Sequence, residues 1–159
     1  MIRQGLLAAL ALLALPARAE EACTPVVQAL LRLGDAPQYH WTMRATTPKR
    51  RRPMEREQIV LGDVVYLTPD EGRWMRQQLS RADRAARMQA ELARTPPEAC
   101  TREPGDKAAM VVYTYHQGTA RKRIWIGAAD GLPHDFTSDE DPVAVKMHVD
   151  YADIVAPID

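Results

Sequence analysis

Repeated alternation of apolar and polar residues constrains the fold of this chain more than any other feature. The clearest case covers residues 143–151, where every second residue is large and apolar or aromatic. Residues 38–45 show the same alternation, and a period of two is the pattern of a half-buried β-strand. Short turn signals such as Gly62-Asp63 join neighbouring segments of this kind. The chain is therefore predicted to form an antiparallel sheet, with no βαβ rhythm that would favour a parallel one.

Two helices are expected beside this sheet. The first should begin at Thr24, whose hydroxyl can cap it, and end at Leu33, before Gly34. The second should run from Ser80 to about Arg94; its inner stripe is mostly alanine, so it buries little area and could act as a lid on the domain surface. The predicted fold class is α+β: a curved antiparallel sheet of about eight strands, an incomplete barrel, wrapped around one or two helices. The expected strands cover residues 38–45, 59–61, 64–68, 73–77, 108–116, 121–126, 135–137 and 143–151.

The first nineteen residues have the layout of a cleavable secretory signal. Arg3 precedes an apolar run from Leu6 to Leu15, and Ala17-Arg18-Ala19 offers small residues before the expected cleavage point after Ala19. The run is about half the roughly 20 residues that a membrane-spanning helix needs. A lipid anchor on Cys23 is less favoured, because acidic residues precede it where a lipobox has small apolar ones. The predicted organisation is a signal peptide over 1–19 and a single domain over 20–159.

The chain has two cysteines, Cys23 and Cys100. In an oxidising compartment such a pair is expected to form a structural disulfide. It would close a loop of roughly 77 residues, for which the chain-entropy model gives about 4.5 kcal/mol of stabilisation as an upper figure. A redox-active pair is less favoured, since the Cys-x-x-Cys spacing that tunes thiol acidity is lacking.

Neither catalytic nor cofactor motifs emerge from the sequence. Beyond the signal segment the serines are Ser80 and Ser138, neither within a Gly-x-Ser-x-Gly elbow, and no phosphate-binding glycine loop occurs. The acidic run 139–141 is predicted to lie in a solvated turn. Removing residues 1–19 leaves two more acidic than basic residues, which does not favour nucleic-acid binding. The sequence therefore predicts no enzyme, no cofactor and no metal site; the four histidines, which lack a close ligand spacing, are His40, His116, His134 and His148.

A basic run, Lys49-Arg50-Arg51-Arg52, lies between Pro48 and Pro53. The prolines and the flanking strand patterns place it at an exposed tip between two strands. The tip is either a solvated turn or a contact for an anion, a membrane surface or another protein.

The carboxy-terminal part of the chain resembles a known family. Trp125-Ile126, then Asp130-Gly131-Leu132-Pro133, and a strand ending in Asp150-Tyr151-Ala152-Asp153-Ile154 before Ala156-Pro157 resemble small secreted bacterial proteins of the LolA-like superfamily. The resemblance covers roughly residues 38–158. It implies an incomplete antiparallel barrel around helices, a periplasmic location, and an apolar concavity that accepts acyl chains in the carriers. The expected role is non-catalytic binding or chaperoning of a hydrophobic ligand, a lipid or an acylated polypeptide. An envelope protein interaction or sensor module with a solid core is the alternative.

The candidate ligand-binding residues are the apolar residues expected on the inner face of the sheet. If they form a filled core, the interaction module is favoured; if they surround open space, the carrier is favoured. They are Tyr39, Trp41, Met43, Ile59, Leu61, Val65, Leu67, Trp125, Val145, Met147 and Val149.

Overall fold

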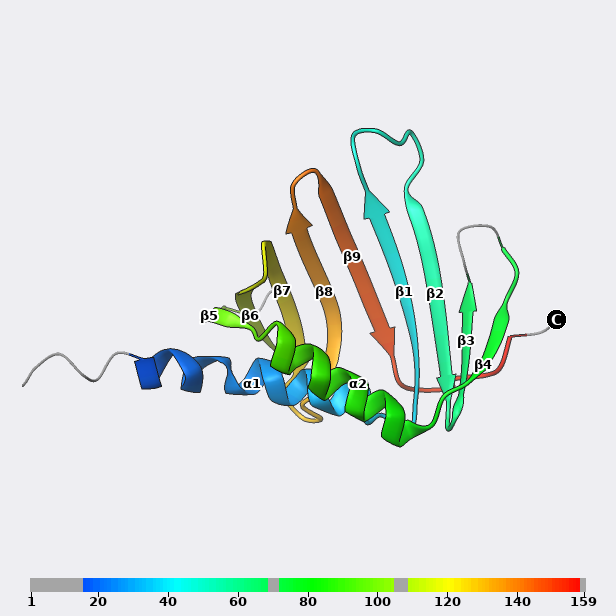
Figure 1. Ribbon diagram of the computed structural model, residues 1–159, viewed down its shortest axis with the longest axis horizontal. Helices are drawn as coiled ribbons and strands as arrows, with labels where there is room; N and C mark the ends of the chain where they lie inside the picture. Colours follow the sequence, from blue (N-terminus) through cyan, green and yellow to red (C-terminus); the bar gives the residue numbers. More distant parts are fainter. Residues whose placement is uncertain (1–15, 69–71, 105–108, 158–159) are drawn as a thin grey trace, which may run out of the picture.

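The computed structural model describes residues 16–68, 72–104 and 109–157. Most of the predicted signal peptide, residues 1–15, lies outside these ranges, and its cleavage stays a prediction. Within the described residues the chain forms two helices and nine strands (Figure 1). They are α1 (Pro16–Gly34), β1 (Gln38–Thr46), β2 (Met54–Leu61), β3 (Val64–Thr68), β4 (Met75–Gln78), α2 (Arg81–Arg94), β5 (Glu98–Glu103), β6 (Met110–Gln117), β7 (Ala120–Gly127), β8 (Pro133–Glu140) and β9 (Val143–Asp150).

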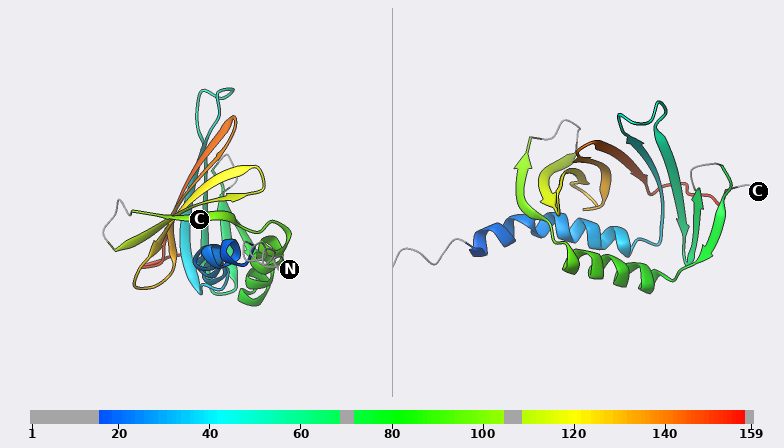
Figure 2. Two further views of the ribbon diagram at one scale, coloured as in Figure 1. Left: turned by 90° about the vertical axis from the view of Figure 1, so that its left-hand side faces the viewer. Right: turned by 45° about the horizontal axis from the view of Figure 1, so that its top comes forward.

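The nine strands form one sheet in the order β4-β3-β2-β1-β9-β8-β7-β6-β5, with antiparallel pairing throughout. Two meanders, β1–β4 and β5–β9, therefore meet where β1 pairs with β9. The edge strands β4 and β5 are not paired with each other, so the sheet is open, and α2 carries the chain from one edge to the other. Figure 2 shows the sheet curling over the helices. The predicted α+β class with a curved, incomplete barrel is confirmed.

One strand more is present than predicted, and one helix begins earlier. β5 has no alternating apolar pattern, and its pairing with β6 is irregular between Glu98 and Thr101. The prediction that the first helix begins at Thr24 is wrong: α1 begins at Pro16 and contains Pro25. Residues 17–23 are mostly good helix formers, so the helix continues although Pro25 cannot donate one backbone hydrogen bond.

The second helix forms as predicted, and hydrogen bonds hold its first turn. The Ser80 hydroxyl caps α2 by accepting from the Asp83 backbone N–H at 3.1 Å. Near this end Arg84 is only 6% exposed and donates to the backbone carbonyls of Gly62, Leu79 and Ala36 at 2.7 to 3.0 Å. The helix packs closely on α1, because a Cβ at Gly34 would lie 2.7 Å from the Met88 Cβ.

Two clusters of buried side chains lie between α1 and the sheet. The first joins both helices to β6 and β7, and the second joins the end of α1 to β1, β2, β3 and β9. Their buried members are Val26, Ala29, Leu30, Leu92, Tyr115, Ile124 and Ile126 in the first, and Leu33, Ala36, Tyr39, Val60, Val65 and Val149 in the second.

The predicted disulfide is present. Cys23 in α1 is bonded to Cys100 in β5, with the two Cα atoms 5.1 Å apart. It fixes the first helix to the far edge of the sheet. Among the described residues no helix is both long and apolar enough to cross a bilayer.

Candidate functional site

The strand register assigns each side chain to one of two faces of the sheet. Residues that pair directly in an antiparallel ladder share a face. Pairing links Ile124 of β7, Phe136 of β8, Met147 of β9 and Met43 of β1 in one row. Because Ile124 belongs to the cluster that contains the helices, this row marks the inner face, toward α1 and α2. The residues that alternate with these four lie on the outer face.

A pocket of about 400 Å³ lies between the inner face and the two helices. The apolar side chains of α1 and α2 line one side of it, and those of β6, β8 and β9 line the other. We call it the inner pocket; its lining residues are Leu30, Leu33, Met88, Glu91, Leu92, Tyr115, Gln117, Lys122, Phe136, Thr137, Ser138, Val145 and Met147. Leu30, Leu33, Leu92 and Tyr115 are buried, whereas Phe136 and Met147 are only partly covered. The pocket therefore has a closed apolar floor and an open rim.

Polar groups of the inner pocket bond to one another at its α2 end. Lys122 Nζ donates to Gln117 Oε1 at 2.7 Å, and Gln117 Nε2 donates to the Thr95 carbonyl at 2.8 Å. Burial lowers the pKa of Lys122, and the negative charges of Glu91 and Glu140 oppose that shift. This chain of hydrogen bonds ties β6 and β7 to the end of α2, and it gives the apolar pocket one polar end.

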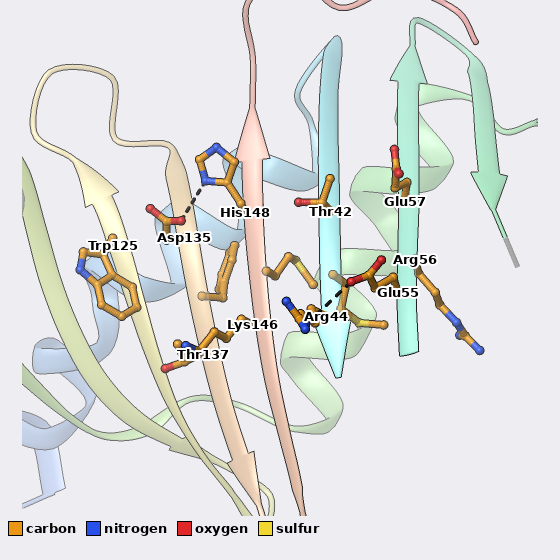
Figure 3. A pocket seen from close by; sticks show the side chains of 13 residues that line it. Thr42, Arg44, Glu55, Arg56, Glu57, Trp125, Asp135, Thr137, Lys146 and His148 are labelled. Atoms are coloured by element: carbon orange, nitrogen blue, oxygen red, sulfur yellow. Dashed lines mark hydrogen bonds and ion pairs between the residues drawn. The ribbon is translucent and has the colours of Figure 1, made fainter. Parts of the chain in front are cut away.

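A second hollow, of about 490 Å³, lies on the outer face (Figure 3). We call it the outer groove; its lining residues are Thr42, Met43, Arg44, Glu55, Arg56, Glu57, Trp125, Asp135, Phe136, Thr137, Lys146, Met147 and His148. Arg44 Nε lies 3.8 Å from Glu55 Oε1, and Figure 3 shows this pair reaching across neighbouring strands. Glu57 Oε2 lies 3.0 Å from Nε2 of His40 just outside the groove. Several charges of the outer groove are thus paired within the protein.

His148 of the outer groove lies between two aspartates. Its Nδ1 lies 2.8 Å from Asp135 Oδ1, and its Nε2 lies 3.2 Å from Asp150 Oδ1. Partial burial lowers the pKa of His148, but hydrogen bonds and charge from the two aspartates outweigh it and raise the pKa above 6.5. Among the described residues, no group of three or more histidine, cysteine or acidic side chains could hold a metal ion.

Comparisons with known proteins return distant structural likenesses. No family model and no curated protein matches the chain. Among solved structures, LprF from Mycobacterium bovis is 11% identical with a TM-score of 0.44, covering 88% of this chain and 97% of that one. The lipoprotein LppX of Mycobacterium tuberculosis is 10% identical with a TM-score of 0.49, covering 86% and 98%. A LolA superfamily protein from Nitrosomonas europaea is 9% identical with a TM-score of 0.29, covering 78% and 91%. The last bears the name of the family that the carboxy-terminal sequence resembles.

The predicted site residues divide into four groups, of which three lie on the inner face. Val145 and Met147 line the inner pocket. Met43 shares the inner face with them, at the position opposite Met147. The others of the inner face pack in or against the second buried cluster and fill space there; they are Tyr39, Trp41, Val65, Leu67 and Val149.

The prediction that all eleven residues share one face is wrong for Ile59, Leu61 and Trp125. Tyr39 pairs with Val60, which turns Ile59 and Leu61 to the outer face. Trp125 pairs with Asp135 and also lies outside, 7% exposed, with the Arg123 guanidinium 4.8 Å from its ring centre. Residues 59–61 are all apolar, so their period is ambiguous, and the pairing partner decides which of them points inward.

Sequence reasoning missed most of the side chains that form the inner pocket. Leu30 and Leu33 belong to the apolar stripe of α1, and Met88 and Leu92 belong to that of α2. Both stripes indicate which face of the helix is buried. Phe136 is the single phenylalanine of the chain and lies at the centre of β8. Its place opposite both Ile124 and Met147 follows only from the register of three strands.

Proposed function

We propose that this protein binds a hydrophobic ligand, the acyl chain of a lipid or of an acylated polypeptide, in the inner pocket. The observation that carries the proposal is the apolar hollow of about 400 Å³ between two helices and an open sheet. Its volume falls within the roughly 300–1,000 Å³ of typical small-molecule sites. Each buried methylene group of an acyl chain would contribute about 0.8 kcal/mol to binding.

The side chains at the rim suit a ligand of variable shape. Met88 and Met147 stand on opposite sides of the pocket, one on α2 and one on β9, and methionine adapts its shape readily because it is unbranched. The polar groups at the α2 end already bond to one another, through Lys122, Gln117 and Thr95. We therefore propose binding and release without a chemical step.

The proposed place of action is the periplasm. The disulfide between Cys23 and Cys100 supports an oxidising compartment, and the amino-terminal pattern supports export. A carrier there would exchange its cargo by reversible apolar burial, with the partly covered residues at the rim as the path of access.

Titration of the delipidated protein with a dansylated fatty acid tests the proposal. Val145→Trp fills the inner pocket, whereas Lys146→Trp adds a tryptophan one residue later, on the outer face. We expect Val145→Trp to raise the dissociation constant about tenfold or more, and Lys146→Trp to leave it near the native value. Thermal unfolding of both variants checks that they fold.

Two results would overturn this proposal. One is a native chain that takes up no dansylated fatty acid. The other is a loss of affinity in Lys146→Trp with none in Val145→Trp, which would place the ligand in the outer groove.

A further inference from the structure

The loop between β1 and β2 carries a concentrated positive charge at one end of the molecule. Its four consecutive basic residues, Lys49–Arg52, are all exposed, and we call them the basic tip. The Arg50 backbone N–H donates to the Thr47 carbonyl at 3.1 Å, and the Lys49 backbone N–H donates to the Thr47 hydroxyl at 3.2 Å. Both hydrogen bonds to Thr47 therefore lie within the loop, and the four side chains extend into solvent.

The basic tip stands beyond the open rim of the inner pocket. Val145 of β9, which lines the pocket, pairs with Ala45 of β1, and Thr46 pairs with Ala144 at the end of the ladder. The loop therefore begins immediately past the row of pocket residues. Figure 1 shows it projecting farther than the neighbouring β8–β9 turn, while α1 and α2 cross the sheet at its other end. A surface that touches the basic tip would lie beyond the end of the pocket that Val145 marks.

We propose that the basic tip docks the protein on an anionic lipid bilayer through the phosphate groups of the lipids. Its purpose, to hold the pocket at a lipid surface, rests on the proposed function, but the docking itself does not. Each basic residue near an anionic surface strengthens binding about fivefold, so four give an increase of several hundredfold. Electrostatic contact of this size without an apolar anchor is reversible, as a carrier requires.

The composition of the tip favours a bilayer over a protein partner. Protein interfaces depend on aromatic or apolar side chains anchored in pockets. In the described part of the chain the large exposed apolar residues are Met75, Val143 and Val155, and none lies in this loop. Exposed long cations, for which the described part of the chain shows no ion pair, match the diffuse charge of a lipid surface instead.

Acidic residues at the β8–β9 turn oppose this attraction. Asp139 and Glu140 end β8 and Asp141 begins the turn, and all three are exposed. The turn leads into β9, which pairs with β1, and Figure 1 shows that it projects less far than the β1–β2 loop. At physiological salt, charges act over about 8 Å, so the acids weaken the contact without cancelling it. A bilayer would bind more tightly if these acids were neutral, whereas a protein partner that matched both signs of charge would bind less tightly.

Co-sedimentation with vesicles tests the proposal. We compare vesicles of phosphatidylcholine alone with vesicles of equal parts phosphatidylcholine and phosphatidylglycerol. The tip variant carries Lys49→Gln, Arg50→Gln, Arg51→Gln and Arg52→Gln. The control removes the same charge from exposed sites elsewhere, with Arg73→Gln, Arg76→Gln, Arg87→Gln and Arg102→Gln. We expect the native chain and the control to bind the anionic vesicles, and the tip variant to bind about a hundredfold less.

A third variant, with Asp139→Asn, Glu140→Gln and Asp141→Asn, should bind anionic vesicles more tightly than the native chain. Three results would overturn the proposal. The tip variant and its control could lose vesicle binding equally, or the native chain could show no preference for phosphatidylglycerol. The third is weaker vesicle binding by the variant that lacks the three acids. Titration with the dansylated fatty acid in the absence of vesicles separates the two proposals. A tip variant that still binds the fatty acid but not vesicles supports docking, and a native chain that binds vesicles but no fatty acid overturns only the carrier function.

Discussion

The inner pocket and the outer groove are similar in volume, about 400 and about 490 Å³, but differ in chemistry. Most of the side chains that line the first are apolar, and Met88, Phe136 and Met147 among them are only partly buried. In the second, charged groups such as Arg44 with Glu55 already meet within the protein. A ligand in the outer groove would have to replace these contacts, whereas a ligand in the inner pocket adds new ones. The volume of a hollow therefore indicates less about ligand binding than the contacts that its lining side chains can still form.

The two faces of the sheet also differ in how much their side chains contribute to the stability of the fold. Buried apolar side chains of the inner face contribute a few kcal/mol each, because their removal leaves a cavity as well as lost burial. Exposed ion pairs of the outer face contribute less than about 1 kcal/mol each. Neighbouring residues of one strand belong to different faces, so adjacent substitutions test the contrast directly.

The largest expected effect comes from β7. Ile124 is 0% exposed on the inner face, and Ile124→Ala should lower the free energy of unfolding by about 2–5 kcal/mol. Arg123, next to it on the outer face, pairs with Glu103 at 2.8 Å and lies over the Trp125 ring, and Arg123→Ala should lose about 1–2 kcal/mol. Chemical denaturation of the two variants measures both values. Equal losses would contradict the assignment of the faces.

Removal of the disulfide should have the second largest effect, and it should alter the inner face only. Replacing both Cys23 and Cys100 by serine should cost about 2–4 kcal/mol of stability. Because the bond fixes α1, which forms part of the pocket floor, affinity for the dansylated fatty acid should fall as well. The His148 titration on the outer face should be unchanged in an NMR experiment. A variant that is less stable but binds the fatty acid normally would show that the pocket does not depend on this bond.

Strict alternation made the positions of some residues predictable from sequence. In β9 the period of two and the observed register agree, so Val145, Met147 and Val149 all lie on the inner face. The disulfide also followed from cysteine number and compartment. In β2 three apolar residues stand in succession, and no local property decides between Val60 and its neighbours; the pairing of Val60 with Tyr39 decides it.

The inner pocket depended on contacts that no short segment encodes. Met88 reaches it because α2 packs on α1 at Gly34, where the absence of a side chain allows close approach. Tyr115 and Phe136 reach it through strands on either side of β7. The sequence therefore predicted that the inner face is apolar, but its filled and open parts differ only through the placement of the helices.

The smallest expected effect is the pH dependence of the outer face. The pKa of His148 is raised in the folded chain, so protonation stabilises the fold. This contribution is complete below the unfolded pKa near 6.5 and disappears as the pH rises through the higher folded pKa. Since half of the His148 side chain is exposed, solvent screening limits the effect to a few tenths of a kcal/mol. Stability should fall slightly as the pH rises above about 6.5. NMR titration should show that Asp135→Asn moves the His148 pKa down, because one of the two carboxylates that hold the imidazolium is lost. His148→Gln should remove this part of the pH dependence; an unchanged slope in that variant would assign it to other groups.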